Sequence, residues 1–524
     1  MPVQPIRGLG HTGVVIDTAA VLLEPNAFSD VRNVRFDNGS VSKILGHTQI
    51  LSSLNNISPG GSAVQPHFGI HWPRPDTRYN IYATESAVYR MNQAGDISNI
   101  SNGPYSAGGR WQGSLVSGGY GVVMNNTVNI PQYSLFDGAG GVASNTLQNL
   151  PGWNYEQDVT NLSARVVRPL QNVLFAGNLR RTVGGVVLSQ PGTIRISNRA
   201  APGAIPQVWD PNSDLADTND AFELSQTEEI LEMEPLRGTM VVYTGDSYHL
   251  VTPTPIQGRE TDVRNFFGYG ILAGDCVAEF DGQHFVVDRN DIYVHSGTGT
   301  PQSVADSRTR DYFFANLNGT HYENTFVSLN RRHDEIWVCF PNLSANADGD
   351  CNEALIWNYR HNTWTIRDLP NIRGGFQGPM VRGGQFIISD ERLVTVGRAD
   401  SLFYAMDEGN TFNGTNFTAF VERKRGAAKA DENSKWVGSF YPLFDANYTT
   451  TTAVTISLRG QNNFANDVDL TDNRTDVRTF NPQEDYKIDP RTNGRLINFR
   501  IETTDDQAWT LAGVSMMIEI DDGR

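Results

Sequence analysis

The side chains with the most evident chemical potential lie in one short segment, NADGDCNE. Asn346, Asp348, Asp350 and Glu353 offer oxygen atoms at closely spaced positions, and such a spacing can collect ligands around Ca²⁺. The EF-hand pattern fails, because its glycine would have to fall at Cys351 and no helical pattern flanks the segment. An exposed hairpin tip, with Asp and Gly chosen for turn geometry, explains the same residues. We therefore predict no metal site and keep Asp348, Asp350 and Glu353 only as alternative ligands.

Sequence patterns typical of catalysis or cofactor binding are absent. There is no His-Glu-x-x-His, Cys-x-x-Cys, Gly-x-Ser-x-Gly or Walker loop. The glycines between Gly268 and Gly274 resemble a dinucleotide loop only superficially, since their spacing is wrong and a strand pattern follows them. No helix N-terminus would face a pyrophosphate there. We predict that the chain binds no cofactor.

The composition indicates many short strands. Apolar residues make up 39% of the 524 residues, and 50 Gly and 25 Pro favour tight turns. Charged residues make up only 19%, without long charge runs, which disfavours wholesale disorder. The length suits two or three domains, or one large β-domain with an appendage.

The charge and the cysteines limit the possible partners and compartment. A net charge of −17 disfavours nucleic-acid binding through released counterions, although DNA could pass an acidic wall without adhering. Cys276, Cys339 and Cys351 are too few and odd in number for a disulfide framework. The segment MPVQPIRGLG lacks the apolar core of a secretory signal, and no stretch of 18 apolar residues occurs. We expect folding in a reducing cytosol.

The elements that would position any site are read most clearly from Cys276 to His295. CVAEF, HFVVD and DIYVH are rich in β-branched and aromatic residues, and Asp281-Gly282 suits a type I′ hairpin turn. This pattern predicts a three-strand meander.

The next segment predicts four antiparallel strands, TFVSLN (325–330), EIWVCF (335–340), ALIWNY (354–359) and TWTIRDL (363–369). This is the size of one β-propeller blade. Its aromatic residues Trp337, Trp357, Tyr359 and Trp364 are expected to pack between sheets and not to stack on a ligand.

Weaker copies of this layout recur along the chain. Hairpins are expected at 81–92, 114–130, 172–198 and 240–252, and three strands at 386–407. The units begin near residues 64, 111, 165, 232, 275, 325 and 376, and such spacing is typical of propeller repeats. We predict an all-β fold, with an irregular β-propeller of six or seven blades over residues 63–410.

Two segments lie outside the repeat. Residues 1–62 are expected to hold an extended segment and a strand pair, NVRF and SVSKIL, that closes the ring or reaches a neighbour. Residues 411–524 show alternating strands typical of a β-sandwich, with a long loop or insertion from Gln461 to Asp489.

Some charged groups suggest contacts more than catalysis. The stretch 208–234 carries nine Asp and Glu residues; it is either a solvated loop or a contact for a basic surface such as Arg423-Lys424-Arg425 of another copy. Propeller enzymes that cleave acidic sugars use an arginine trio, whereas Arg264, Arg289, Arg308 and Arg310 are scattered over strand ends and loops. Chance carboxylate pairs are inevitable among 58 acidic residues. We predict that the protein is not an enzyme.

Four segments carry a family resemblance. They are AFSDVRNVRFDNGSVSKILG (27–46), GILAGDCVAEFDGQHFVVDRNDIYVHSG (270–297), CNEALIWNYRHNTWTIRDLP (351–370), and GRLINFRI through WTLAGV (494–514). Together they resemble the tail nozzle proteins of short-tailed bacteriophages, also described as tail hub or packaged-DNA stabilisation proteins.

The resemblance implies a structural subunit of a virion tail. Such subunits form a hexameric ring below the portal and the head-to-tail adaptor, retain packaged DNA, conduct it during ejection and receive a tail fibre or needle. It implies no catalytic residues. The positions that match the family's motifs are turn and packing positions: Asn33, Gly39, Asp281, Gly282, Asp291, Asn358, Trp364, Arg495 and Trp509.

Two other functions stay open at this point. One is a receptor- or glycan-binding propeller at the tail tip, and the other is a hydrolase of surface glycans. The sequence does not fix the number of blades, the stoichiometry, the loops that gate a channel or the host.

Overall fold

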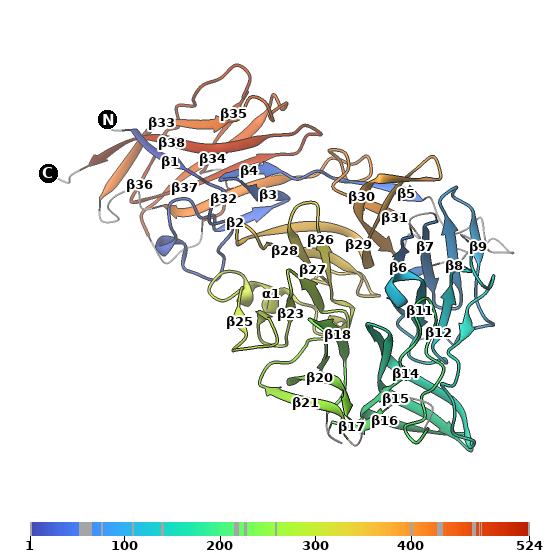
Figure 1. Ribbon diagram of the computed structural model, residues 1–524. Helices are drawn as coiled ribbons and strands as arrows, with labels where there is room; N and C mark the ends of the chain where they lie inside the picture. The colour runs from blue at the N-terminus through green and yellow to red at the C-terminus, as the bar shows by residue number, and fades with distance from the viewer. Residues whose placement is uncertain are drawn as a thin grey trace.

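The fold was analysed in a computed structural model. It describes residues 3–51, 65–74, 77–106, 109–137, 141–213, 220–224, 228–256, 259–398, 402–426, 433–463, 468–470, 472 and 474–521. These residues form an all-β protein with many four-stranded antiparallel sheets (Figure 1). No helix among them has the length and apolar character needed to cross a bilayer.

Within the described residues, the sheets from residue 47 to residue 406 divide into seven four-stranded units in chain order. Unit 1 contains β6 (Pro66–Trp72), β7 (Tyr79–Thr84), β8 (Val88–Asn92) and β9 (Ile97–Asn99). Unit 2 contains β10 (Gln112–Val116), β11 (Gly121–Asn125), β12 (Gln132–Leu135) and β13 (Gln148–Asn149). Unit 3 contains β14 (Val159–Leu170), β15 (Val173–Val183), β16 (Val186–Ile196) and β17 (Asp220–Glu223).

The remaining units follow the same order. Unit 4 contains β18 (Glu232–Leu236), β19 (Thr239–Tyr243), β20 (Ser247–Ile256) and β21 (Arg259–Phe267). Unit 5 contains β22 (Val277–Phe280), β23 (Gln283–Val287), β24 (Ile292–His295) and β25 (Gln302–Ser303). Unit 6 contains β26 (Phe326–Asn330), β27 (Glu335–Phe340), β28 (Cys351–Asn358) and the first half of β29 (Thr363–Arg382). Unit 7 contains the second half of β29, then β30 (Gln385–Gly397), β31 (Phe403–Met406) and β5 (His47–Leu51).

The first strands of the units form a closed cycle of contacts. β6 contacts β10, and the cycle continues through β14, β18, β22 and β26 to β29, which contacts β6. Each unit therefore contributes its first strand to the centre of a ring. This radial arrangement is that of a β-propeller. The ring is closed by β5, which comes from the N-terminal part of the chain and pairs with β31.

The strand predictions for unit 7 were wrong in two respects. The strand expected to end at 369 runs on to Arg382 and joins units 6 and 7 into one seven-stranded sheet. The segment predicted to hold three strands holds two, because β30 continues through Asp390 and Glu391. The pairing register with β29 shifts between Pro379 and Met380, so that the extra residues of β30 bulge out while the strand pairing continues on both sides.

Two further sheets join residues from both ends of the chain. The first holds β3 (Val34–Asp37), β4 (Ser40–Lys43), β38 (Thr510–Asp521), β33 (Ser434–Phe444) and β36 (Thr492–Gly494), with β1 (Val3–Arg7) paired to β38. The second holds β2 (Asp30–Arg32), β32 (Ala419–Gly426), β37 (Leu496–Thr503), β34 (Val454–Gln461) and β35 (Asp476–Phe480). Both termini lie near each other at this end of the molecule in Figure 1.

The N-terminal strand pair is present, and its neighbours are the C-terminal strands. Val34 pairs with Lys43 across the β3–β4 hairpin, and β4 pairs with β38. The segment expected to be a loop or insertion from Gln461 contains β35.

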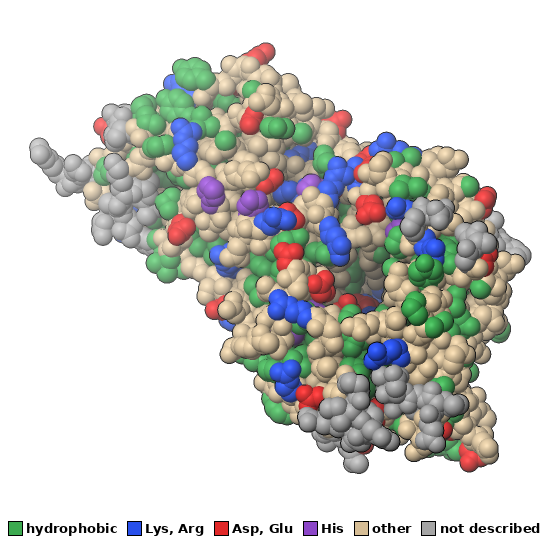
Figure 2. Space-filling view, viewed as in Figure 1, with side chains coloured by type: hydrophobic (Ala, Val, Ile, Leu, Met, Phe, Trp, Pro, Cys, Tyr) green, Lys and Arg blue, Asp and Glu red, His purple; other side chains and the backbone are tan. Residues whose placement is uncertain are grey.

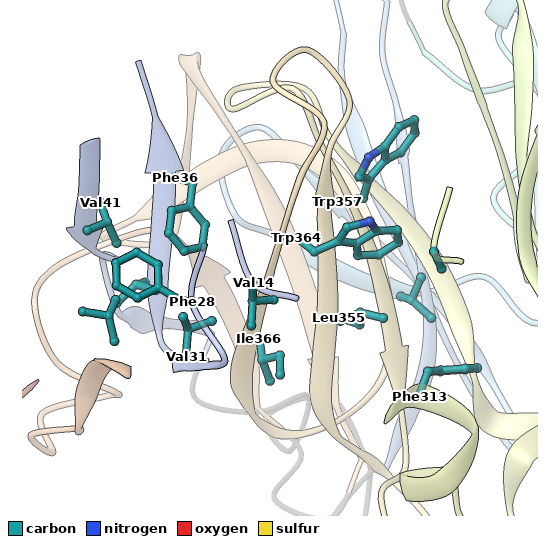
Figure 3. Packing of buried hydrophobic residues seen from close by; sticks show 14 of the residues in the cluster. Val14, Phe28, Val31, Phe36, Val41, Phe313, Leu355, Trp357, Trp364 and Ile366 are labelled. Atoms are coloured by element: carbon teal, nitrogen blue, oxygen red, sulfur yellow. The ribbon is translucent and has the colours of Figure 1, made fainter. Parts of the chain in front are cut away.

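A continuous apolar core joins these two sheets to unit 6. Phe28 stacks on Phe36, and both belong to the same buried cluster as Ile366 and Trp364 (Figure 3). Trp364 in turn stacks on Trp357, with 6.2 Å between ring centroids. Trp357 also stacks on Phe285 of unit 5, with 5.5 Å between ring centroids, which confirms the predicted packing between sheets. The cluster as a whole joins the two parts of the chain.

Buried ion pairs reinforce the same joint. Arg35 of β3 lies 3.0 Å from a carboxylate oxygen of Asp407 and 3.1 Å from one of Glu335. Arg367 of β29 also donates to Asp407, at 2.8 Å. Burial alone would raise the pKa of Asp407, but the two arginines lower it well below its usual range. Removing one member would leave the others charged and buried.

Candidate functional site

A cavity of about 830 Å³ opens where the innermost strands of the ring begin. Residues from every unit line it: His67 and Glu85; Gly109, Arg110, Gln112 and Thr127; Arg165, Asn178, Arg180, Val187 and Ser189; Glu229; Ala273 and Gly274; Glu323 and Asn324; Arg373 and Arg398. Concave sites with converging polar groups are the default candidates for ligand binding. This cavity is therefore the place to look for chemistry.

The cavity wall carries charges of both signs, and most of them are paired. Arg165 lies 2.6 Å from Glu229, and Arg110 lies 3.0 Å from Asp275. Figure 2 likewise shows basic and acidic side chains interspersed over the middle of the face that it presents. Because Arg110, Arg165, Arg373 and Arg398 each have a carboxylate beside them and only Arg180 makes no ion pair among the described residues, the wall offers little net attraction for an anion.

Below the wall, a buried ion-pair network forms the floor. Arg168 of β14 lies 3.0 Å from Glu232 and 3.4 Å from Asp275. Gln112 donates to Glu232 at 2.9 Å. Burial raises the pKa of Glu232, while Arg168 opposes that shift. This network links units 2, 3, 4 and 5 and fixes their inner strands to one another.

The histidine of the cavity is not placed to activate a nucleophile. His67 lies 3.3 Å from Arg398 and 3.9 Å from Glu85. Burial, assisted by Arg398, lowers the pKa of His67 to about 4, so the ring is neutral at neutral pH. Ser189 belongs to another unit, and the described contacts of His67 include no hydroxyl group.

The carboxylates considered as metal ligands face different partners. Asp348 lies 2.8 Å from Arg398, and Asp350 accepts a hydrogen bond from Arg373 at 2.9 Å. Glu353 is 2.7 Å from Arg32. Within the described residues, no group of three His, Cys, Asp or Glu side chains is placed to hold a metal ion. The alternative of a cation site at this loop is not supported, because arginines already neutralise its carboxylates.

The turn residues carried over from the family have the backbone geometry that turns require. Asp281 and Gly282 have φ angles of 45° and 71°, as a type I′ turn demands, and Gly39 has a φ of 78°. The carboxylate of Asp291 accepts from the N–H of Ile292 at 2.8 Å. These residues shape hairpins, and none of them lines the cavity.

Two asparagines hold longer connections in place. Asn33 has a φ of 57°, and its amide donates to Asp368 at 2.7 Å and to the carbonyl oxygen of Thr418 at 2.8 Å. Asn358 accepts from the N–H of His361 at 2.9 Å. Asn33 therefore connects β29 with the residues just before β32.

The remaining family positions lie in or beside packed regions. Trp364 and Trp509 are fully buried, and their indole N–H groups donate to the carbonyl oxygen of Val304 at 3.0 Å and to the hydroxyl of Thr503 at 2.8 Å. The backbone N–H of Arg495 donates to Asn462 at 3.0 Å.

The first residue of the basic tripeptide contacts its own chain. Arg423 is buried and donates to the carbonyl oxygens of Ala20 and Leu23, at 2.8 Å each. The guanidinium of Arg423 is thus engaged within this chain, and the alternative that the tripeptide receives an acidic stretch of another copy stays a prediction. Of the acidic stretch 208–234, residues 214–219 and 225–227 lie outside the described residues.

The other sequence features have structural roles as well. The segment Gly268–Gly274 connects β21 to β22. Cys276, Cys339 and Cys351 are free and buried, and burial raises the pKa of the Cys276 thiol to about 12.

Sequence reasoning missed the arginines that converge on the cavity. Arg110, Arg165, Arg180, Arg373 and Arg398 come from three units and lie far apart in the chain. The one available signal is that Arg110 lies just before an innermost strand and Arg165 and Arg373 lie within one, but this is visible only once the ring order is known.

Comparisons with known proteins give structural neighbours only. No family model matches the chain, and no curated protein matches it. PorZ, a bacterial surface component of the type-IX secretion system of Porphyromonas gingivalis, is 8% identical over 73% of this chain and 43% of its own, with a TM-score of 0.35. The β-propeller domain of Cps50 (Swd1) from Myceliophteria thermophila is 7% identical over 66% and 97%, and U3-55K is 10% identical over 66% and 96%, both with TM-scores of 0.38.

The structural neighbours are thus β-propellers, and this chain spans under half the length of PorZ. That the chain is an all-β protein with its four-stranded sheets in a ring rests on its own strand pairing and contacts. The similarity is too distant to carry any function from these proteins to this one.

Proposed function

We propose that the chain is a structural subunit of the tail nozzle of a short-tailed bacteriophage, built as a seven-bladed β-propeller with a C-terminal β-sandwich. In this role it extends the channel of the portal and adaptor, retains packaged DNA and conducts it during ejection. The subunit is assembled in the cytoplasm of the bacterial host and resides in the virion tail. The head-to-tail adaptor and a tail fibre or needle are its partners.

The observation that carries the proposal is the internal pairing of charges around the cavity. Arg110, Arg165, Arg373 and Arg398 each have a carboxylate partner in the same chain. An enzyme of this size would present an acid, base or nucleophile with a perturbed pKa toward substrate. A conduit subunit needs instead a rigid wall whose charges are mostly paired, and no turnover.

The overall charge supports passage of DNA without adhesion. Six copies of −17 would give a ring of −102, and a wall of that sign repels phosphate groups. The buried joint through Arg35, Asp407 and Glu335 supports the same role, because it keeps the sandwich and the propeller in one orientation under load.

The test is assembly with a head-to-tail adaptor from the same phage. The two proteins are purified, mixed and examined by size-exclusion chromatography with light scattering and by electron microscopy. We expect a ring of this chain stacked on the adaptor and no release of reducing ends from host polysaccharides. A chain that stays monomeric with its adaptor under all ionic conditions would remove the proposal.

One observation favours receptor or glycan binding as the second candidate. Arg110, Arg373 and Arg398 lie around one cavity of about 830 Å³, where spare N–H groups could bind the carboxylate of an acidic sugar. A glycan array distinguishes the two: binding of acidic glycans that is lost in Arg373→Ala would favour this reading over a purely structural subunit.

A further inference from the structure

The β15–β16 hairpin of unit 3 presents an unusual apolar tip to solvent. Val186, Val187 and Leu188 are consecutive, and 61%, 54% and 41% of their surfaces are exposed. Isolated exposed aliphatic residues are ordinary, but a contiguous group at the end of a projecting hairpin marks an interaction site.

Part of the outer edge of the same hairpin is also without a partner in the described residues. β16 begins at Val186, yet its pairing with β17 covers only Thr193 to Ile196, and the carbonyl oxygens of Pro191 and Gly192 accept from Ile230 and Leu224. The first residues of β16, Val186 to Gln190, therefore form an open strand edge, which proteins usually protect when no partner exists.

The arrangement of side chains across the hairpin separates two faces. Thr182 pairs with Val187, and Arg180 pairs with Ser189, so these four residues share one face. Arg180 is exposed and makes no ion pair among the described residues. This face, which borders the cavity, thus combines Val187 with the cation of Arg180, whereas Val186 and Leu188 lie on the opposite face of the hairpin.

A groove of complementary character lies between units 3 and 4. It has a volume of about 510 Å³ and is lined by the apolar residues Phe222, Leu224, Val263 and Phe267 together with Glu223, Glu228, His249 and Asn265. Phe267 is 70% exposed. Glu223 is exposed and has no ion-pair partner in the described part of the chain. In Figure 1, β17 lies beside β16 and β21 at the lower edge of the ring.

We propose that the hairpin tip of one copy of this chain inserts into the groove between units 3 and 4 of a second copy. Val187 covers the rings of Phe222 and Phe267, and Arg180, on the same face of the hairpin, pairs with Glu223. A second copy is the occupant that fits, because the tip is apolar and basic while the groove is apolar and acidic.

This inference rests on the proposed assembly of several copies and names the contact that would connect them. A tip of three aliphatic residues is too small to hold two proteins alone, since stable interfaces bury on the order of 1,200–2,000 Å². It acts as the anchor of a larger interface, where a few buried side chains contribute most of the affinity.

Cysteine crosslinking tests the contact directly. Val187→Cys and Phe267→Cys are made separately, in a chain whose three native cysteines are buried. Under mild oxidation, the mixture of the two variants should give a crosslinked dimer, whereas each variant alone should not. Val187→Cys mixed with Tyr448→Cys, an exposed position on the sandwich, is the matched control.

The variant that carries both Val187→Cys and Phe267→Cys shows how many copies the contact joins. A ladder of bands up to a closed ring would support both the contact and the nozzle. A ladder that stops at two would mean that the contact is reciprocal, as in a two-fold dimer, which keeps the inference and counts against the nozzle.

The opposite results overturn the contact. If the mixture crosslinks no more than the control while the unmodified chain still forms a ring on its adaptor, the tip–groove contact is wrong and the nozzle stands. Crosslinking of the Val187→Cys variant with itself would also overturn the proposed contact, since the hairpin tips of two copies would then lie against each other.

A charge substitution gives an independent readout. Val187→Asp should weaken self-association at least tenfold, whereas Leu343→Asp, at an exposed loop position, should not. Both variants should unfold at the temperature of the unmodified chain, because neither side chain is buried. Association of Val187→Asp equal to that of the control variant contradicts the proposal.

Discussion

A buried chain of hydrogen bonds in units 4 and 5 predicts that the protein loses stability in mild acid. The hydroxyl of Tyr243 lies 2.7 Å from Nδ1 of His284 and 2.6 Å from Nε2 of His295. Nε2 of His284 lies 3.1 Å from the carbonyl oxygen of Pro235. The N–H of Gly297 donates to Nδ1 of His295, at 3.2 Å.

These partners assign one proton to each imidazole ring. The carbonyl oxygen of Pro235 can only accept, so Nε2 of His284 carries its proton and Nδ1 accepts from Tyr243. The hydroxyl oxygen of Tyr243 then accepts from Nε2 of His295, whose Nδ1 accepts from Gly297. A second proton on either ring would place two donors face to face.

The magnitude follows from the shift of each pKa. Burial lowers the pKa of His284 to about 4 and that of His295 to about 3, against about 6.5 in the unfolded chain. As the pH falls below 6.5, the two histidines bind protons in the unfolded state but not in the native state, and this lowers the free energy of unfolding. At pH 5 each ring therefore costs about 2 kcal/mol of stability relative to pH 8, and the two together cost about 4 kcal/mol. This loss of stability stops increasing only when the pH falls below the pKa values of the two histidines in the native state.

The assay is urea unfolding at pH 8, 6 and 5, compared with the variant His284→Gln/His295→Gln. The variant should be less stable at pH 8, and its loss between pH 8 and pH 5 should be smaller by about 4 kcal/mol. Replacement of the exposed His361, which is not part of this hydrogen-bond chain, by Gln is the matched control for the substitution itself. Ring-carbon NMR signals of His284 or His295 that titrate near pH 6.5 would refute the reasoning.

Three further changes probe the fold. Arg35→Ala should cost about 3–5 kcal/mol by leaving Asp407 buried without one of its cations, and calorimetry should then resolve separate transitions for the sandwich and the propeller; a single unshifted transition would contradict this. Gly282 has a φ of 71°, and the methyl group of Gly282→Ala would lie 3.0 Å from a side-chain atom. This substitution should lower the free energy of unfolding by about 1 kcal/mol, measured by chemical denaturation. Gly319→Ala, whose methyl group would meet open space, should not. Trp364→Ala should cost about 3–5 kcal/mol, measured by the same method, and an effect below 1 kcal/mol would show that the joint does not depend on it.

The local hairpins could be predicted because their signals lie within a few residues. Period-two alternation and the Asp281-Gly282 turn place β22 and β23 correctly. The same applies to β26, β27 and β28, whose registers join neighbouring segments. In each case the turn chemistry and the side-chain pattern act on the same short stretch.

The sequence did not reveal features that depend on distant partners. The strand β29 passes from unit 6 into unit 7 through Pro370 without a turn signal that would show two sheets being joined. The closing strand β5 finds β31 more than 350 residues away. The convergence of Arg110, Arg165 and Arg373 on one cavity likewise requires the order of the ring, which periodicity alone does not supply.

The pairing of β1 with β38 has a mechanical consequence. Both ends of the polypeptide lie in the two sheets outside the ring. The chain leaves these sheets to form the ring and then returns to them. Because the pairing is antiparallel, both free ends leave the β1–β38 ladder at Val3 and Met517, so pulling the termini apart opens its five residue pairs one after another, toward Arg7 opposite Gly513. The strands of the ring carry none of this force, so the ring keeps its shape while the two ends are pulled.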